Sequence, residues 1–185
     1  MKSKLDELQA EIAISEPDII CLTEAKPKNG QVPDKEILNL NSYDLFLNPA
    51  FNDEDTRGVC IYVKQYLNAR AVETNITKSF KDSAWLEISG RNNKKLLMST
   101  VYRSGSPDKA KLLDNDLHNT IKKMSLSKEY SQIVISGDFN HPSIKWTETL
   151  GEDGDNLVIP ELSRQHNPDH HDVAFLECLS DLAAK

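Results

Sequence analysis

Cysteine is scarce in this chain: its 185 residues include three, Cys21, Cys60 and Cys178, and they lie far apart. That number and spacing exclude a disulfide framework and a zinc motif built on paired cysteines. Cys21 and Cys60 each lie inside an apolar run, where a free thiol behaves as a small hydrophobic side chain. Free thiols are typical of a reducing compartment, so we expect an intracellular protein, nuclear or cytoplasmic.

Long hydrophobic runs are also absent. No apolar stretch approaches the roughly 20 residues that a membrane-spanning helix needs. The first residues, Met1 to Glu7, are mostly charged or polar and lack the apolar core of a secretion signal. We therefore expect neither a membrane protein nor a secreted one.

An excess of positive charge is missing as well. The chain has 29 acidic and 22 basic residues and a formal net charge of −7. This balance argues against tight, non-specific binding of nucleic acid by the whole surface, because such binding depends on many phosphate contacts. It does not exclude an enzyme that cleaves phosphodiester bonds with a metal ion, since the ion neutralises its acidic ligands.

What remains is the composition of a globular domain, with 38% hydrophobic and 28% charged residues. We expect a single domain over residues 1–185, of α/β or α+β class, in which strands outnumber helices. Helices are predicted near both ends and over 107–124, and a surface loop over 147–171. Strands are predicted at the following ranges: 18–24, 43–47, 58–64, 84–88, 96–102 and 132–136.

The stretch from Gln132 to Pro142 carries the strongest local signal. An apolar β-branched run predicts a buried strand, and Gly137 lets the backbone bend at its end. Alternate residues of an extended segment point the same way, so Asp138 and Asn140 would project together. A carboxylate beside an amide can hold a hard cation and orient a water. The alternative interpretation is that both residues simply favour a turn after a strand.

Two further predicted strands end in functional side chains. Glu24 follows the strand that begins at Asp18, and Tyr102 ends the strand over 96–102. Polar groups that converge at the strand ends of a packed sheet are a common way to build a site. Each of these residues alone also fits an ordinary loop position at the surface.

The order of these motifs resembles the endonuclease/exonuclease/phosphatase superfamily, and in particular the apurinic-endonuclease-like domain of non-LTR (LINE-type) retrotransposon polyproteins. Pro17 to Glu24 resembles the family's first acidic motif, and Arg57 to Val63 its glycine-led strand. The stretch 101–103 is similar to its tyrosine motif, and the stretch 136–140, with Trp146 shortly after, to its GDFN motif. The resemblance spans nearly the whole chain.

The resemblance implies a four-layer α/β/β/α sandwich of the DNase I-like type. It implies that Glu24 coordinates Mg²⁺, with Mn²⁺ as a possible substitute. Asp138 would position or deprotonate the attacking water, Asn140 would hold that water or a phosphate oxygen, and Tyr102 would donate a hydrogen bond to the phosphate. Arg103 would either contact a phosphate or be an ordinary surface arginine.

The resemblance also has gaps. The family begins with a strand that carries an asparagine near the metal, whereas this chain begins at the following helix. It ends with strands that carry an aspartate and a Ser-Asp-His motif, which we expect to be missing here. We do not take the run His170-His171-Asp172 as a substitute, because it lies in a polar stretch before a helix, and we expect His118 at the surface of its helix.

Three functions remain open from the sequence. The first is a metal-dependent DNA endonuclease that nicks the target DNA of a retrotransposon, with a downstream reverse transcriptase domain in a longer parent protein. The second is a non-catalytic, truncated remnant that acts as a binding module. The third keeps the superfamily but hydrolyses a phospholipid or an inositol phosphate, an alternative that the retrotransposon-like context of the motifs disfavours. The oligomeric state stays open.

Overall fold

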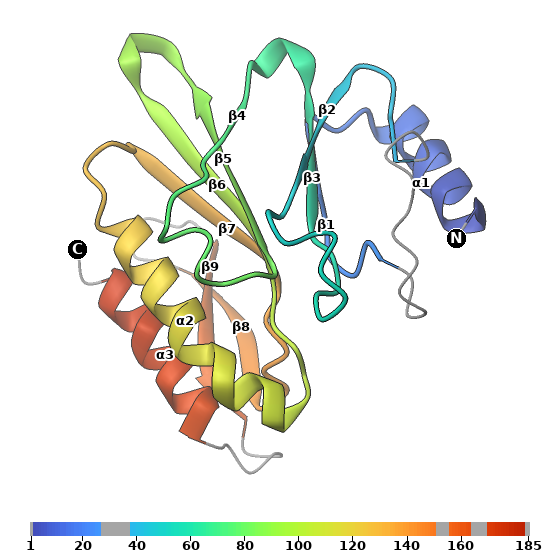
Figure 1. Ribbon diagram of the computed structural model, residues 1–185. Helices are drawn as coiled ribbons and strands as arrows, with labels where there is room; N and C mark the ends of the chain where they lie inside the picture. Colours follow the sequence, from blue (N-terminus) through green and yellow to red (C-terminus); the bar gives the residue numbers. More distant parts are fainter. Residues whose placement is uncertain (1, 27–37, 151–155, 164–169, 184–185) are drawn as a thin grey trace. The chain divides into compact units, whose positions relative to one another are not determined.

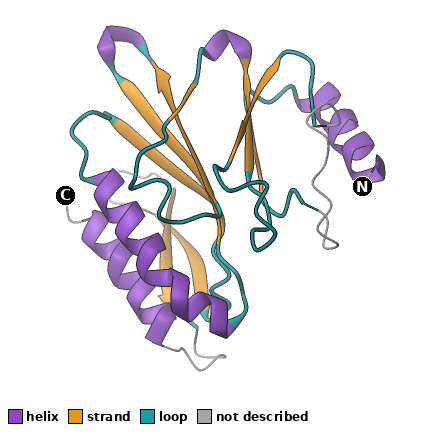
Figure 2. Ribbon diagram, viewed as in Figure 1, coloured by secondary structure: helices purple, strands orange, loops and turns teal. Residues whose placement is uncertain are grey.

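The computed structural model describes residues 2–26, 38–150, 156–163 and 170–183. The chain divides into two compact units, and each is described by itself. The first unit comprises Met1–Tyr102 and Leu126–Asp138, and the second comprises Arg103–Ser125 and Phe139–Lys185. Figures 1 and 2 show the elements of both units along the chain.

The first unit contains a helix at its start and two sheets. Figure 1 shows α1, the sheet of β1 to β3 and the sheet of β4 to β7 as successive layers of this unit. Its elements, in chain order, are α1 (Lys2–Ser15), β1 (Ile19–Leu22), β2 (Tyr43–Leu47), β3 (Cys60–Lys64), the short 3-10 helix η1 (Gln65–Leu67), β4 (Arg70–Ala71), β5 (Ser83–Ser89), the 3-10 turn η2 (Arg91–Asn93), β6 (Lys95–Tyr102) and β7 (Gln132–Asp138).

Strand β3 is the centre of the first sheet, whose order is β1-β3-β2 and whose pairs are both antiparallel. Alternate side chains of a strand point to opposite faces, so β3 serves two layers. Cys60 and Tyr62 face one side, where Leu8 and Ile12 of α1 pack against their cluster. Val59, Ile61 and Val63 face the other side and pack against the second sheet.

The core of the first unit lies between the two sheets. Val59, Ile61 and Val63 around β3 form one buried cluster with Ala84 and Leu86 of β5. Burying apolar area at about 25 cal/mol per Å² makes this interface the main favourable contribution to the folding of the unit. The alternation of apolar residues in both segments thus produces two packed sheets, in agreement with the sandwich that the family resemblance implied.

The second sheet has the order β4-β5-β6-β7. Strands β5 and β6, both predicted as strands, form an antiparallel hairpin. Its turn holds Asn92 and Asn93 at φ of 57° and 58°, a left-handed conformation that asparagine tolerates better than most residues. Strand β7 pairs parallel with β6, from Leu96 opposite Gln132 to Tyr102 opposite Asp138.

The burial predicted for β7 is wrong. The strand is only partly covered, and Val134 is 45% exposed. Among the described strands β7 pairs with β6 alone, so it is an edge strand, and one side of it meets solvent. The apolar run indicated a strand correctly, but the run alone does not tell a central strand from an edge strand.

The second unit contains two helices and a hairpin. Helix α3 contacts both α2 and β9, and Phe175 of α3 is buried, with its ring 5.8 Å from that of His118 on α2. The elements, in chain order, are α2 (Pro107–Ser125), β8 (Ile144–Leu150), β9 (Asn156–Leu162) and α3 (His170–Ala183).

The hairpin of β8 and β9 overturns the surface loop expected over 147–171. The two strands pair antiparallel from Ile144 opposite Leu162 to Leu150 opposite Asn156. The expected loop was drawn around the glycine- and aspartate-rich stretch 151–155, which lies outside the described residues. Ile144 and Trp146 alternate with Lys145 and Thr147, which is the period of a strand, and residues 157–159 form a short apolar run that also fits a strand.

The mixed α/β class is confirmed, with several sheets and three helices. The single domain over 1–185 stays a prediction beside the two compact units. None of the helices, as far as the structure describes them, has the length and apolar character needed to cross a bilayer.

Candidate active site

Tyr102 and Asp138 meet because of the register between β6 and β7. They are the last residues of their strands and lie directly opposite each other in the parallel pair. Paired residues of neighbouring strands present their side chains on the same face of a sheet. Parallel pairing also brings the carboxyl ends of both strands to one edge. The carboxylate of Asp138 is close enough to raise the pKa of Tyr102, although burial and Glu24 raise it more.

Gly137 makes this close pairing possible. It has φ of +140°, and a Cβ built on it would lie 1.9 Å from the carbonyl oxygen of Val101, its partner on β6. No side chain fits at that distance, and L-residues rarely adopt that φ. The glycine before Asp138 is therefore required by the approach of the two strands, in addition to the bend that the sequence predicted.

Glu24 comes to the same place from the first sheet. It lies two residues beyond β1 and has φ of 52°, a left-handed conformation that is uncommon for glutamate. Such a backbone costs on the order of 1–3 kcal/mol and persists where the surroundings hold it. Its Oε1 accepts a hydrogen bond of 3.1 Å from the hydroxyl of Tyr102. The structure thus brings Glu24, Tyr102 and Asp138 together within the first unit.

Arg57 is a member of this site that the sequence analysis did not assign. Its Nη2 and Nε donate to Oε1 of Glu24 at 2.9 and 3.2 Å. The backbone brings it there, because Ala25 N–H donates to Gly58 carbonyl oxygen at 2.9 Å and so extends the pairing of β1 with β3. The signal was present in the sequence, since Arg57 begins the glycine-led strand motif.

Gly58 is needed for the same approach. It has φ of +77°, and a Cβ there would lie 2.7 Å from Cγ of Lys26 and 2.9 Å from the ring of Phe51. The turn of chain after Glu24 therefore packs directly on the backbone beside Arg57. This contact holds both ends of the Glu24–Arg57 ion pair in place.

Asp82, which the sequence analysis also missed, connects the strands at this edge. Its Oδ1 accepts from the Arg57 backbone N–H at 3.0 Å, and its carbonyl oxygen accepts from the Tyr102 N–H at 2.9 Å. Burial raises the pKa of its carboxyl group, against the hydrogen bonds from Arg57 and Gly58. Asp82 is a positioning residue for Arg57 and Tyr102. No motif marks it in the sequence.

Asn140 lies in the second unit, where its amide is engaged. Its side-chain Nδ2 donates to the backbone carbonyl oxygen of Arg103 at 2.6 Å, and its backbone carbonyl oxygen accepts from Nη1 of Arg103 at 2.8 Å. Its φ of 48° is left-handed, like that of Glu24. The predicted contact of Asn140 with a water or a phosphate oxygen stays a prediction.

Arg103 is not a surface arginine. It is 5% exposed, and its Nε and Nη2 bind the two carboxylate oxygens of Asp114 at 2.7 and 2.9 Å. The pair holds the pKa of Asp114 below its usual range, although burial alone would raise it. A phosphate would have to displace Asp114 or a backbone carbonyl oxygen to reach this guanidinium. The structure therefore favours a structural role for Arg103 within the second unit.

His118, His141 and His171 make contacts inside the second unit, and the surface position predicted for His118 is wrong. His118 was expected at the surface of its helix, but its ring lies 5.8 Å from that of Phe175, and burial lowers its pKa. The ring of His141 stacks on Phe175 at 4.4 Å, and its Nδ1 lies 2.9 Å from Oδ1 of Asp172. His171 binds Asp114 at 2.6 Å. These residues hold α3 within the unit.

The run 170–172 lies inside α3, whose first residue is His170, and not in a stretch ahead of the helix. Asp172 and His171 are engaged by partners of the second unit. The sequence analysis set this run aside as a replacement for the family's phosphate-contacting histidine. The contacts that the structure shows here are structural ones.

The donor set of the first unit fits a hard divalent ion. The carboxylate of Glu24 is 45% exposed, and Asp138 is exposed on the same edge. Mg²⁺ is commonly held by one or two carboxylates, with waters and substrate phosphates completing its shell. Among the described residues no three His, Cys, Asp or Glu side chains form a group that could hold a metal. Glu24 and Asp138 supply two carboxylates of the kind that Mg²⁺ uses.

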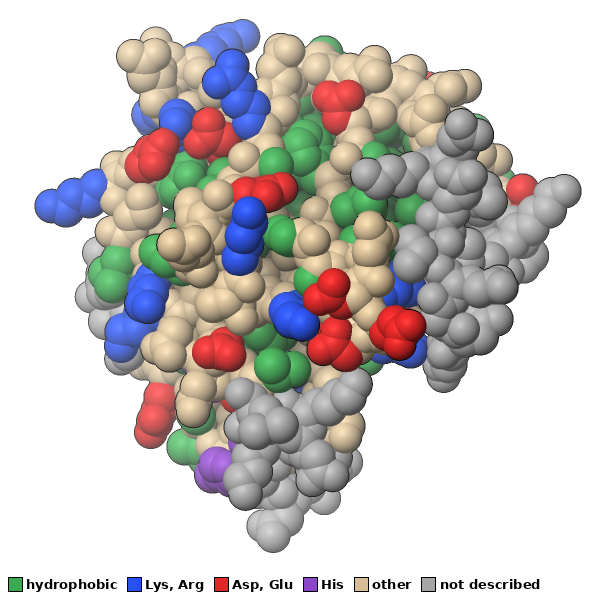
Figure 3. All heavy atoms as spheres, in the orientation of Figure 1, with side chains coloured by type: hydrophobic (Ala, Val, Ile, Leu, Met, Phe, Trp, Pro, Cys, Tyr) green, Lys and Arg blue, Asp and Glu red, His purple; other side chains and the backbone are tan. Residues whose placement is uncertain are grey.

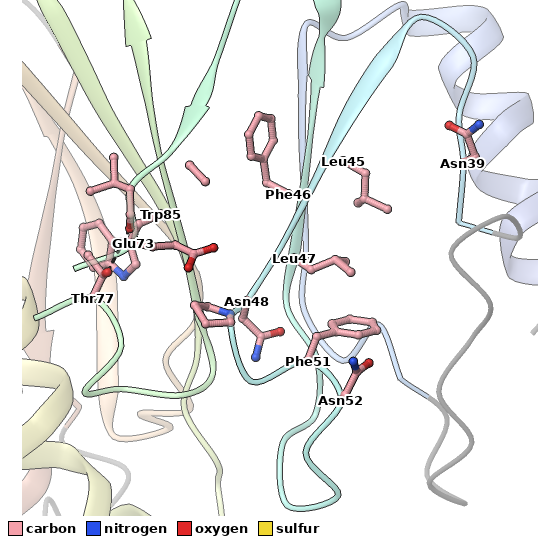
Figure 4. A pocket seen from close by; sticks show the side chains of 13 residues that line it. Asn39, Leu45, Phe46, Leu47, Asn48, Phe51, Asn52, Glu73, Thr77 and Trp85 are labelled. Atoms are coloured by element: carbon pink, nitrogen blue, oxygen red, sulfur yellow. Dashed lines mark hydrogen bonds between the residues drawn. The ribbon is translucent and has the colours of Figure 1, made fainter. Parts of the chain in front are cut away.

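A pocket of about 600 Å³ opens elsewhere in the first unit (Figure 4). Phe46 of β2 and Trp85 of β5 line it from the two sheets, and neither Glu24, Tyr102 nor Asp138 takes part. Asn48 at its rim uses its amide inside the protein, accepting from Val59 N–H and donating to Lys81 carbonyl oxygen. The pocket is a gap between the sheet edges and is separate from the candidate site.

Comparisons with known proteins bear on the family and the fold of the chain. A profile of the Endonuclease/Exonuclease/phosphatase family matches residues 1–174. A humanized D. rerio TDP2 with 14 mutations has a similar structure, with a TM-score of 0.50 and 16% identity over 91% of this chain and 80% of that one. A functionally unknown conserved protein from Enterococcus faecalis V583 gives 0.51 and 14%, over 74% and 57%.

At these identities the likeness shows the fold alone, and it confirms the expected DNase I-like class. No curated protein matches the sequence. The assignment to the retrotransposon branch stays a prediction.

Proposed function

The chain belongs to the Endonuclease/Exonuclease/phosphatase family, and on that premise we propose that it hydrolyses phosphodiester bonds of DNA with the help of a divalent metal ion. One observation carries the proposal. Glu24, Tyr102 and Asp138 come from three different strands or strand ends and meet at one edge of the first unit. They are a carboxylate for an ion, a hydroxyl donor and a second carboxylate.

Asp138 acts as the base in this proposal. Its exposed carboxylate takes a proton from the attacking water, and the water oxygen then bonds to phosphorus as the bond to the leaving oxygen breaks. The Tyr102 hydroxyl, whose hydrogen goes to Glu24 in the structure, turns to donate it to a non-bridging phosphate oxygen once Glu24 holds an ion, and so binds the oxygen where negative charge builds up. Burial, the bond to Glu24 and the nearby Asp138 all raise the pKa of Tyr102, so the hydroxyl keeps its proton at neutral pH. Asn140 follows Asp138 by two residues and holds the water or a phosphate oxygen.

Glu24 holds the ion, Mg²⁺ or Mn²⁺. When bound, the ion neutralises charge on the phosphate and acts as a Lewis acid. Asp82 keeps Arg57 and Tyr102 in place beside Glu24 through its two hydrogen bonds to their backbones. In this proposal the chain supplies a general base, a hydrogen-bond donor and a metal ligand, all at one edge of the first unit that Asp82 stabilises.

DNA contacts are expected to be local rather than spread over the surface. On the face drawn in Figure 3, Lys and Arg side chains lie interspersed with Asp and Glu and form no continuous basic patch. With a net charge of −7, affinity would come from the site and its immediate surroundings. The motif order supports a retrotransposon endonuclease that nicks target DNA, in a parent protein that also carries a reverse transcriptase. We expect it to act inside the cell.

The test is the nicking of supercoiled plasmid by the purified 185-residue chain with Mg²⁺ or Mn²⁺. Asp138→Ala should abolish nicking, whereas Glu54→Ala, which removes an exposed carboxylate outside the site, should leave it intact. A folded chain that retards DNA in a gel but never nicks it would favour the non-catalytic binding module. Hydrolysis of inositol phosphates without nicking would favour the lipid-type alternative.

A further inference from the structure

Arg57 occupies the carboxylate oxygen that lies at the centre of the candidate site. Its Nη2 and Nε lie 2.9 and 3.2 Å from Oε1 of Glu24, and the Tyr102 hydroxyl lies 3.1 Å from the same atom. One oxygen thus accepts three hydrogen bonds. A divalent cation on that oxygen would need the electron pairs that these donors use, and it would repel the guanidinium. Arg57 and the ion therefore compete for Glu24.

The side chain of Arg57 can move without disturbing its backbone. The backbone is held separately, because its N–H donates to Asp82 at 3.0 Å and its carbonyl oxygen accepts from Lys26 N–H at 3.1 Å. The side chains of Arg57 and Glu24 are 28% and 45% exposed. An ion pair this exposed changes an equilibrium constant by a factor of about two to five. A divalent metal ion that binds Glu24 can therefore displace the Arg57 side chain from it.

Arg103, which directly follows β6, shows what a fixed guanidinium looks like in this protein. It is buried, and it binds both oxygens of Asp114 and the carbonyl oxygen of Asn140. Freeing it would leave a carboxylate buried without its partner, which is costly. Arg57 has the opposite character: its side chain is partly exposed, and both of its hydrogen bonds to Glu24 go to a carboxylate that also suits a metal.

We infer that Arg57 is a built-in counterion for Glu24 that a divalent metal ion displaces, and that the released guanidinium then binds a phosphate oxygen of the substrate. The inference rests on the proposed function for the identity of the substrate. An arginine fork matches the geometry of a phosphate and keeps its charge at every relevant pH. Glu24 also raises the pKa of Arg57.

The exchange predicts coupling between the metal and the nucleic acid. In the metal-free protein Arg57 neutralises Glu24 and is not available to a phosphate. In the metal-bound protein the ion takes over that role, and the arginine adds one positive charge to the substrate side. Coupling between two ligands is reciprocal, so each should tighten the binding of the other. Part of this coupling should disappear when Arg57 is replaced.

The first test measures metal binding alone. Mn²⁺ is titrated into the full chain at constant ionic strength and followed by the electron paramagnetic resonance of the free ion. Arg57→Gln should bind Mn²⁺ about two- to fivefold more tightly than the natural chain. The matched control is Arg91→Gln, which removes the same charge from an exposed turn at the other end of β6. That variant should bind as the natural chain does.

The outcomes separate this inference from the proposed function. Equal or weaker Mn²⁺ binding by Arg57→Gln, with plasmid nicking by the natural chain intact, overturns the exchange and leaves the proposed function standing. No Mn²⁺ binding by any of the proteins overturns both. Binding by Arg57→Gln where the natural chain binds none supports the exchange, since the counterion then blocks the site.

The second test measures the coupling. Duplex DNA binding is followed by fluorescence anisotropy with and without Mn²⁺, in an Asp138→Asn background that keeps the DNA uncut. Replacing Arg57 by Gln should reduce the Mn²⁺-dependent gain in affinity. With Mn²⁺ present, the slope of log K against log salt should be about 1 less negative for the Arg57→Gln protein than for the protein with Arg57. Without Mn²⁺ the two slopes should be equal. The same loss of slope without Mn²⁺ would contradict the exchange, because Arg57 would then reach phosphate without displacement.

Discussion

Tyr102 and Asp138 lie opposite each other at the ends of two parallel strands, and Gly137 lets those strands approach. The hydroxyl of Tyr102 also reaches Glu24 from the other sheet, at 3.1 Å. Tyr102 therefore connects the Asp138 end of the second sheet with Glu24 of the first sheet at the candidate site. A change in the register of β6 and β7 would separate the base from the donor.

Gly137→Ala should be strongly destabilising, because its Cβ would lie 1.9 Å from the Val101 carbonyl oxygen and its φ is +140°. We expect the free energy of unfolding to fall by roughly 2–4 kcal/mol, the range of severe single substitutions. Urea denaturation followed by circular dichroism measures this loss. Gly90→Ala is the matched control: its nearest neighbour would be 3.3 Å away, so its loss should stay below about 1 kcal/mol. Equal losses would show that β7 can shift.

Tyr102→Phe should leave the fold intact and reduce turnover. The ring stays in place, but the hydrogen bond to phosphate is lost, and removal of one such donor costs about 10²–10³ in rate. The measurement is kcat for nicking beside the unfolding midpoint of both proteins. Tyr130→Phe, which removes a hydroxyl from a tyrosine outside the site, is the control. Unchanged kcat in Tyr102→Phe would remove the hydroxyl from the mechanism.

The sequence indicated which residues lie at the candidate site better than it indicated which contacts they make. Glu24, Tyr102 and Asp138 were predictable because each ends an apolar run, and strand ends meet at sheet edges. The Glu24–Arg57 pair was not predictable, because it depends on a left-handed backbone at Glu24 that no local pattern indicates. His118 was misplaced for a related reason. Helical periodicity gives the face of a residue but not whether a second helix, here with Phe175, covers it.

Breaking the Arg103–Asp114 pair should cost far more stability than breaking the Arg57–Glu24 pair. Arg103→Ala leaves a buried carboxylate without its main partner, a loss of about 3–5 kcal/mol. Arg57→Ala breaks an exposed pair, a loss of at most about 1 kcal/mol. Urea denaturation of both variants tests the contrast. Similar values for the two would mean that solvent reaches the Arg103 pair.

Acid should weaken the protein through His118. Burial lowers the pKa of His118 in the folded state below its usual value of 6.5, so the unfolded chain binds the proton more readily. Stability should therefore fall as pH drops below about 6.5 and continue falling until the folded form is protonated. Burial lowers the pKa of His141 as well, against the opposing effect of Asp172, and it adds to the loss.

The measurement compares unfolding free energies at pH 7.5 and 5.5 for the natural chain and for His118→Gln. The variant should lose part of the difference between the two pH values. The comparison is needed because Asp82, whose pKa is raised in the folded state, changes stability in the opposite direction as pH falls. An identical pH dependence in both proteins would contradict the burial of His118.

Mg²⁺ should stabilise the folded chain through Glu24. A ligand that binds only the folded state adds RT ln(1 + [L]/Kd), which is about 2.7 kcal/mol when the free ion is at 100 times its Kd. For a domain of this size that corresponds to a rise in Tm of roughly 5–10 °C. Glu24→Gln should lose the rise in Tm, because an amide oxygen carries no charge to attract the ion. The control is Glu54→Gln, which changes an exposed carboxylate outside the site and should keep the rise.

Arg57→Gln should show a larger rise in Tm than the natural chain at the same subsaturating Mg²⁺ concentration, because its Glu24 has no competing guanidinium. A rise that survives in Glu24→Gln would place the ion elsewhere on the protein.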